Sequence, residues 1–286
     1  MRSLLDSFAS ATFRRAILEV VIVGITSGIV GVHVLLRRLP FFVVAMSHAT
    51  FPGVVIASLL GMNLLLGASL FGLLVVIAVV AVGTAQALDD ATATGVVLAG
   101  SFAIGVVIMS ARPGSSRELS SFLVGSVLTV SRGDVGAAIA VTGLVLAVLA
   151  LLHKELVLSA FDPIATAALG YPRSRLDAAL LVVVTISLVV SIPAVGTLLS
   201  VALLTVPALT ARLWSDRIGT AMAIAASIGA ASGFVGLCAS ALWRIAAGGA
   251  IALTCSACFV VSLAIRLLRD SRRPAGTAPS QLLPPR

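Results

Sequence analysis

The sequence predicts an all-α membrane protein, a polytopic bundle of transmembrane helices. Of its 286 residues 59% are hydrophobic and only 10% are charged, whereas soluble domains carry about 25% charged residues. Long charge-free runs separate the charges, the longest being the 50 residues from 39 to 88, and one membrane span needs about 20 apolar residues. These runs lack the polar alternation of β-barrel strands. The composition also excludes a disordered chain, a secreted disulfide scaffold and a nucleic-acid-binding domain.

The charge-free runs locate the helices of the first half of the chain. Residues 1–15 are expected to form a cytoplasmic or interfacial segment, and the transmembrane domain is expected to cover residues 16–266. The apolar segment 119–131 is too short for an ordinary span and is counted as a short crossing. Full spans are predicted at residues 16–36, 40–60, 64–84, 92–110 and 135–152.

A hydrophilic loop, residues 153–177, opens the second half. The 34-residue run 178–211 contains Pro193, and because proline breaks helices, two short helices are predicted there, at 178–191 and 194–211. Full spans are predicted at residues 218–243 and 246–266. Residues 267–286 contain four prolines and are predicted to form a disordered cytoplasmic tail.

The basic residues give a predicted orientation. Ten crossings, about eight full spans and two short or broken segments, put both termini on one side. If that side is the cytoplasm, fifteen of the 19 basic residues are cytoplasmic, and the positive-inside rule favours this orientation. The four exceptions are Arg37, Arg38, Arg132 and Arg244. Two GxxxG pairs, Gly24/Gly28 and Gly229/Gly233, favour close helix packing within the chain.

Ser47, His48 and Pro52 form the first candidate site. His48 is the one strongly ionisable or metal-binding side chain in the 50-residue run, and an ionisable residue at membrane depth indicates function. Pro52 has no N–H to donate to the carbonyl of residue 48, so the helix is expected to be broken near mid-depth. Neutral imidazole suits transition metals. A histidine bonded to a neighbouring helix is the structural alternative.

The second candidate site is a short helix in the loop 153–177. Asp162 suits the N-cap, Pro163 the first helical position and Gly170 the residue after the C-terminus. The predicted helix of about seven residues is too short to be stable alone. Its apolar residues, including Ile164 and Leu169, therefore need a partner, which is either another protein or the chain's own cytoplasmic face.

The sequence contains no nucleotide-binding motif of the GxxxxGK[ST] type. ATP hydrolysis must therefore come from another chain if transport is ATP-driven. An ion-coupled secondary transporter would need acidic residues at membrane depth, where only Glu19 comes close. The spans contain no paired carboxylates, HExxH motif or Ser/His/Asp set, so no enzyme and no cofactor are predicted.

The chain resembles the permease subunits of bacterial metal-ion ABC importers of the zinc, manganese or iron type. The resemblance covers residues 16–266 and rests on four stretches. These are Met46-Ser47-His48-Ala49-Thr50-Phe51-Pro52-Gly53, residues 122–131 (Phe-Leu-Val-Gly-Ser-Val-Leu-Thr-Val-Ser), residues 155–170 from Glu155 through Phe161-Asp162-Pro163 to Ala168-Leu169-Gly170, and residues 193–208 from Pro193-Ala194-Val195-Gly196 to Thr205-Val206-Pro207-Ala208.

The resemblance implies the fold of a type II ABC importer and a multi-pass permease in the bacterial cytoplasmic membrane. It implies a homodimer with a second permease copy, two cytoplasmic ATP-binding subunits, an extracytoplasmic solute-binding protein and contact with membrane lipid, but no nucleic acid. Ser47, His48 and Pro52 would line the translocation pathway, with His48 as the metal ligand. The residues implied to couple the permease to the ATPase are Phe161, Asp162, Pro163, Ala168, Leu169 and Gly170.

One position departs from the family. The family often has an Asp four residues before this His, where a carboxylate and an imidazole share one helix face. Here the position is Val44, and His48 alone is a poor site for a divalent cation. The chain is therefore either a branch that carries another, non-metal substrate, or a dimer that pairs two His48 side chains. The transported ion is left open.

Overall fold

The computed structural model describes residues 10–86, 90–111 and 131–271. Every regular element in these ranges is a helix, and eight of the helices are long and apolar enough to cross a membrane. The predicted all-α bundle is therefore confirmed. Residues 1–9 and 272–286 lie outside the described residues, as does the predicted short crossing at 119–131 apart from Ser131.

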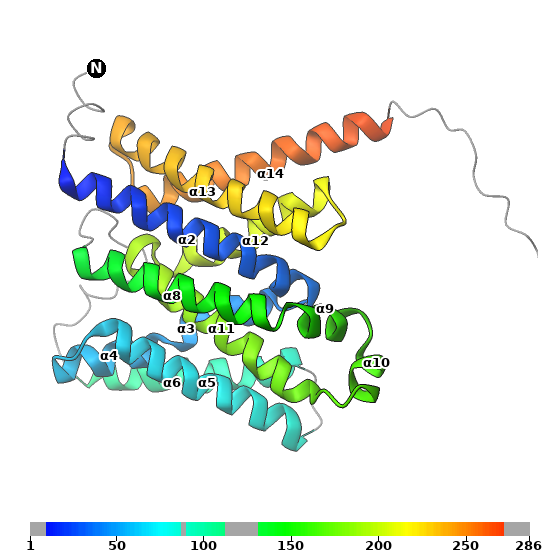
Figure 1. The fold of residues 1–286 in the computed structure, drawn as a ribbon. Helices are drawn as coiled ribbons and strands as arrows, with labels where there is room; N and C mark the ends of the chain where they lie inside the picture. The colour runs from blue at the N-terminus through cyan, green and yellow to red at the C-terminus, as the bar shows by residue number, and fades with distance from the viewer. Residues whose placement is uncertain (1–9, 87–89, 112–130, 272–286) are drawn as a thin grey trace, which may run out of the picture.

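Within each described range the helices follow one another with short connections (Figure 1). Their bounds are α2 Ala11–Leu36, α3 Pro40–Ala49, α4 Phe51–Leu60, α5 Leu64–Gln86, α6 Asp90–Ser110, α8 Arg132–Leu151, α9 His153–Phe161, α10 Pro163–Ala168, α11 Arg173–Val195, α12 Thr197–Trp214, α13 Ile218–Trp243 and α14 Ala247–Ser271. The last helix thus extends five residues, 267–271, into the segment predicted to be a disordered tail.

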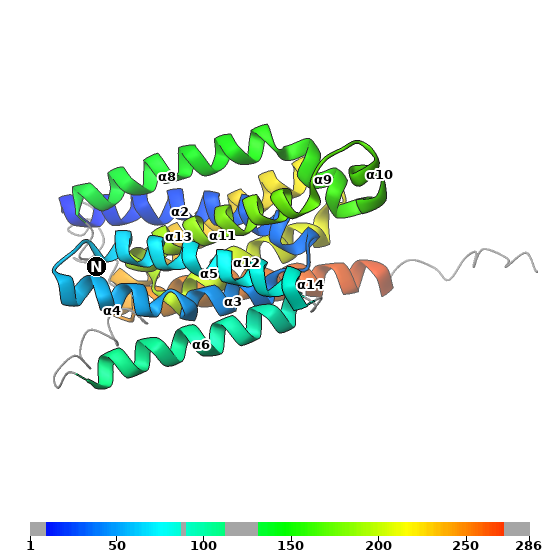
Figure 2. The same cartoon turned by 90° about the horizontal axis from the view of Figure 1, so that it is seen from below.

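Successive long helices reverse direction, and the long axes lie roughly side by side (Figures 1 and 2). The largest apolar core joins α2, α3, α5, α8 and α11 through buried side chains such as Val30, Met46, Val76 and Leu188. A second core joins α2 to α11, α12, α13 and α14. Both cores include α2 and α11, so these two helices connect the two halves of the bundle.

The GxxxG pairs of α2 and α13 pack against each other inside the chain, as predicted. A Cβ atom added to Gly24 would lie 2.6 Å from the carbonyl carbon of Gly229. A Cβ atom added to Gly28 would meet the backbone of Ala225, and one added to Gly233 would meet Val20. The absence of these side chains allows the two backbones to approach, so van der Waals contact between the helices is extensive.

Side-chain contacts fix the relative directions of α2 and α8. The Thr26 and Thr142 hydroxyl oxygens are 2.8 Å apart. Further along the chain, the ring of His33 in α2 meets the ring of His153, the first residue of α9, edge to face, with centroids 5.7 Å apart. The residue numbers of these contacts increase together in the two segments, which means that α2 and α8 run parallel. Arg37 pairs with Asp177 at the same end.

These directions correct the predicted topology. The eight candidate spans and the shorter apolar helix Leu199–Trp214 give nine crossings in the described residues, and Ser110 and Arg132 lie at the same end of the bundle (Figures 1 and 2). The start of α2 and the end of α14 lie at opposite ends of the bundle (Figure 1), whereas the sequence predicts both termini on one side; residues 1–9 and 272–286, and the predicted short crossing apart from Ser131, lie outside the described residues.

The corrected topology also removes an exception to the charge distribution. Arg37 and Arg38, predicted to lie apart from the loop 153–177, lie at the same end as that loop. Among the described residues this end has nine basic side chains, and the other end has four. The nine are Arg37, Arg38, Lys154, Arg173, Arg175, Arg212, Arg217, Arg266 and Arg269, and the four are Arg14, Arg15, Arg132 and Arg244.

The break in the run 178–211 lies three residues beyond the predicted one. Helix α11 continues through Pro193 to Val195 and is a full span of 23 residues, not a short segment. It ends at Gly196, whose φ of 81° and ψ of 166° are accessible mainly to glycine. Proline in the last turn removes only one hydrogen bond, which neighbouring elements in a bundle compensate, whereas the Gly196 conformation ends the helix outright.

We expect Gly24→Leu to destabilise the protein, because the added side chain must separate α2 from α13. Overpacking of a close interface costs about 3 kcal/mol. The matched control is Gly143→Leu in α8, since nothing lies within 4 Å of a Cβ atom at that position. Thermal unfolding in detergent, followed by size-exclusion chromatography, measures both variants. Equal melting temperatures for the two would contradict the packing assigned to Gly24.

Candidate functional site

His48 lies in the last turn of α3, directly before an interruption of the span 40–60. Helix α3 ends at Ala49, and α4 starts at Phe51 with Pro52 in its first turn. The predicted break is therefore confirmed, and it is centred on Thr50. The hydroxyl of Thr50 is buried without a hydrogen-bond partner among the described residues.

The surroundings of His48 are aromatic and apolar. Its ring meets Phe102 of α6 edge to face, with centroids 6.4 Å apart, and Phe102 in turn packs against Phe51 at 6.0 Å. Ser47 is buried and donates a hydrogen bond to the carbonyl of Val44 at 2.8 Å. The Ser47 hydroxyl thus points along its own helix and not toward the His48 imidazole.

The chain leaves one face of α3 uncovered. Phe41 and Val44, seven and four residues before His48, are 48% and 40% exposed, and His48 itself is partly exposed. Residues at this spacing share a helix face. The described residues contain no group of three or more His, Cys, Asp or Glu side chains that could hold a metal ion, and His48 is not part of such a group.

The short helix α10 has the ends that the sequence predicts. The Asp162 carboxylate accepts a hydrogen bond from the Ala165 N–H at 2.8 Å, and Pro163 is the first helical residue. After the helix, Gly170 has a φ of 79°, and the Tyr171 N–H donates to the Thr166 carbonyl at 3.2 Å. These bonds satisfy backbone groups at both ends of a helix of only six residues.

Most of the α10 surface points away from the bundle. Thr166 is buried, and its hydroxyl donates to the carbonyl of Asp162, the N-cap of the same helix, at 2.8 Å. Phe161, Ile164 and Leu169 are 65%, 83% and 66% exposed, and α10 projects from one end of the bundle (Figure 1). An apolar surface beyond the ends of the spanning helices is a candidate docking site.

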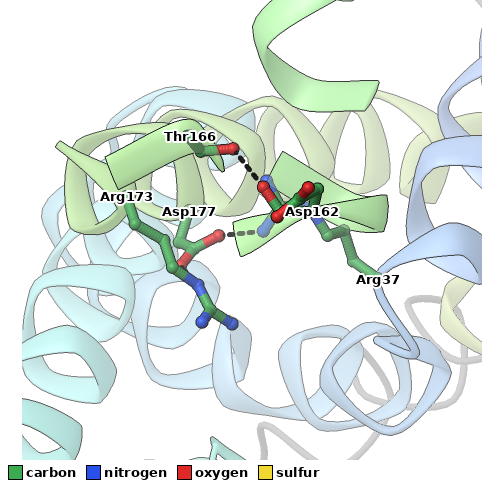
Figure 3. Close-up of polar contacts among 5 residues, drawn as sticks. All are labelled: Arg37, Asp162, Thr166, Arg173 and Asp177. Atoms are coloured by element: carbon green, nitrogen blue, oxygen red, sulfur yellow. Dashed lines mark hydrogen bonds and ion pairs between the residues drawn. The ribbon is translucent and has the colours of Figure 1, made fainter. Parts of the chain in front are cut away.

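The sequence did not reveal the ion pair at the base of α10. Arg37, just after α2, donates from Nη1 to the carboxylate of Asp177 in α11 (Figure 3). Arg173 lies one turn earlier on α11, with its Nε 3.5 Å from the other oxygen of Asp177. The misplacement of Arg37 among the exceptions to the charge bias was the available signal, because a basic residue on the wrong side suggests a wrong count of crossings.

The two candidate sites are separated along α3. His48 follows Pro40, the first residue of α3, by eight positions, about 12 Å along the helix axis. Pro40 lies at the α10 end of the bundle, close in sequence to Arg37. The short helix α3 thus connects the α10 end of the bundle to the region of His48.

Comparisons with known proteins agree with this architecture. Residues 9–266 match the model of the ABC 3 transport family. The chain is 33% identical over 249 residues to the manganese transport system membrane protein MntC of Listeria monocytogenes, covering 87% of this chain and 89% of MntC. It is 33% identical over 273 residues to the zinc transport system membrane protein TroC of Treponema pallidum, covering 92% of each.

A solved structure shows the same fold. The chain superimposes on PsaBC from Streptococcus pneumoniae in complex with Fab with a TM-score of 0.80 and 30% sequence identity, covering 89% of this chain and 91% of that one. The family model covers nearly all the described helices, and the sequence relatives are similar to this chain along most of their own length. This multi-pass membrane protein therefore belongs to the ABC 3 transport family, as a permease subunit.

Proposed function

We propose that the chain imports a divalent transition-metal ion across the bacterial cytoplasmic membrane, using ATP hydrolysed by partner subunits. The observation that carries the proposal is the exposed segment 161–170 around α10, called the α10 stub below. It presents Phe161, Ile164 and Leu169 to solvent beyond the bundle. The sequence has no nucleotide-binding motif of its own. The names of MntC and TroC support manganese or zinc as the class of ion.

The charge distribution supports an orientation with α10 in the cytoplasm. The α10 end has nine basic side chains and the opposite end four among the described residues, and short cytoplasmic loops carry the excess of Lys and Arg. The start of α2 then lies outside the cytoplasm and the end of α14 inside. In this orientation α10 faces two cytoplasmic ATP-binding subunits, one for each copy of the permease.

The uncovered face of α3 supports a homodimer with the pathway at its interface. An exposed imidazole on a lipid-facing surface is costly, so ionisable side chains in spans face other protein or a water-filled path. A second copy would cover Phe41 and Val44 and bring a second His48 to the same interface. Two imidazoles suit a transition-metal ion, which an extracytoplasmic binding protein would deliver.

We expect Gly170→Arg to abolish uptake without unfolding the chain. Nothing lies within 4 Å of a Cβ atom at Gly170, and its φ is +79°, so the arginine would project from the docking surface. Gly61→Arg is the matched control at the other end of the bundle, because Gly61 also has a positive φ, +66°, and open space around it. Uptake of radiolabelled zinc and manganese by cells, normalised to membrane abundance, measures both.

Both glycines have a positive φ, so an added side chain strains the backbone in both variants, and the control accounts for that strain. Gly61→Arg should therefore transport normally, whereas Gly170→Arg should also lose the ATP-binding subunits on co-purification. Normal uptake by Gly170→Arg would exclude α10 as the coupling element.

We expect His48→Ala to reduce the initial rate of metal uptake at unchanged membrane abundance. Losing one ligand contact of about 1.4 kcal/mol lowers binding about tenfold. Phe41→Ala on the same exposed face removes apolar area but no ligand atom, so its uptake should fall much less. The rates are measured with radiolabelled zinc and manganese in parallel. Equal rates for His48→Ala and the parent chain would make His48 a structural residue.

A further inference from the structure

The half-buried ion pair between Arg37 and Asp177 differs from the other two ion pairs among the described residues. Those two, Arg173–Asp177 and Arg212–Asp216, each join residues four positions apart on one stretch of chain. The Arg37 pair spans 140 positions and ties the end of α2 to the first turns of α11. Among the ion pairs of the described residues, it is therefore the pair that connects two helices far apart in the sequence.

Arg37 has little besides Asp177 to compensate its charge. Its side chain is only 9% exposed, and its buried Nε and Nη2 groups have no hydrogen-bond partner among the described residues. Asp177 is 38% exposed and has a second cationic neighbour in Arg173, whose side chain is 57% exposed. The buried guanidinium therefore depends on the carboxylate, whereas the carboxylate has an alternative partner on its own helix.

The pair lies between the stub and the helix that carries His48. On one side, α10 packs against α11 and is joined to it by the short connection 169–172. On the other side, Arg37 opens the turn into α3. Figure 3 shows the Arg37 side chain reaching toward Asp177, in the same close-up as Asp162 and Thr166 of the stub.

The turn after Arg37 is tightly bonded. The Arg37 N–H donates to the His33 carbonyl at 3.1 Å, the Arg38 N–H to the Leu35 carbonyl at 3.2 Å, and the Leu39 N–H to the Val34 carbonyl at 2.9 Å. Arg38 has a φ of 56°, which non-glycine residues rarely adopt. A turn fixed in this way transmits a displacement of Arg37 to Pro40 and α3.

We propose that Arg37 and Asp177 are positioning residues that transmit movement of the α10 stub to α3 and thereby to His48. The inference rests on the proposed function, since it assigns the stub to the ATPase. The pair touches no substrate in this scheme. It holds the α2–α3 turn to the first turns of α11, so that a shift of the stub reaches the pathway instead of being lost at the surface.

The test uses the complete transporter, permease with its ATP-binding subunits and binding protein, in proteoliposomes. The main variant is Arg37→Met combined with Asp177→Ala, which removes both charges together and keeps much of the buried aliphatic stem, so no unpaired charge is left. The readout is metal ions imported per ATP hydrolysed, a ratio that simple loss of folded protein does not change. Arg212→Met with Asp216→Ala is the control, an ion pair at the same end within one segment.

We expect the main variant to import at least fivefold fewer ions per ATP hydrolysed while it still co-purifies with the ATP-binding subunits. The control should keep the parent ratio. The exchanged pair, Arg37→Asp with Asp177→Arg, should recover at least half of the loss, because the attraction is restored with reversed polarity. If the main variant does not assemble, Arg37→Lys decides the question. It keeps the positive charge but has a shorter side chain without the forked guanidinium group, and it should lower the ratio at least twofold.

An unchanged ratio in the main variant, or in Arg37→Lys when that variant decides, would overturn the proposal. So would a control that loses as much coupling as the main variant. Failure of the proposed function gives a different result, since the parent transporter would then show no ATP-dependent import or no association with ATP-binding subunits.

Discussion

The requirement that backbone polar groups be satisfied inside a bilayer determines this architecture. In hydrocarbon a spanning segment pairs its N–H and C=O groups along its own helix, and irregular backbone is tolerated only where protein or a cavity covers it. In the described residues the chain obeys this rule with long helices, and its apolar runs 39–88 and 178–211 are interrupted at Thr50 and at Gly196. Both are covered by protein, because Thr50 and Thr197 are fully or almost fully buried.

The interruption at Thr50 connects this constraint to function. It divides the span 40–60 into α3 and α4, so His48 lies at the end of a short helix and not in the middle of a long one. The two halves contact different neighbours, since α3 packs on α12 and α11 as well as on α6, whereas α4 packs on α5 and α6. The interruption is local, since Thr50 keeps right-handed helical dihedrals, φ −77° and ψ −12°, and its N–H donates to the Met46 carbonyl at 3.2 Å.

The sequence predicted the elements well and their relation in space less well. Asp162, Pro163 and Gly170 defined α10 because capping is local chemistry, and the glycine pairs of α2 and α13 were interpreted correctly as intrachain packing. Apolar length alone could not place the segment 119–131, because a short apolar segment looks the same in sequence whether or not it crosses the membrane. The Arg37–Asp177 pair joins positions 140 apart, and no local pattern indicates such a partner.

The tight packing of α2 explains why α3 is the element free to respond. Along α2 the Gly24 and Gly28 backbones lie against α13 with no room for a Cβ atom, and interiors packed this closely shift between discrete arrangements more readily than they deform. A displacement at the last turn of α2 is therefore not absorbed by deformation of α2 itself. The adjoining helix α3 follows a rigid turn at one end and ends at Thr50 at the other. Motion that enters at Arg37 is thus directed to the segment that ends with His48.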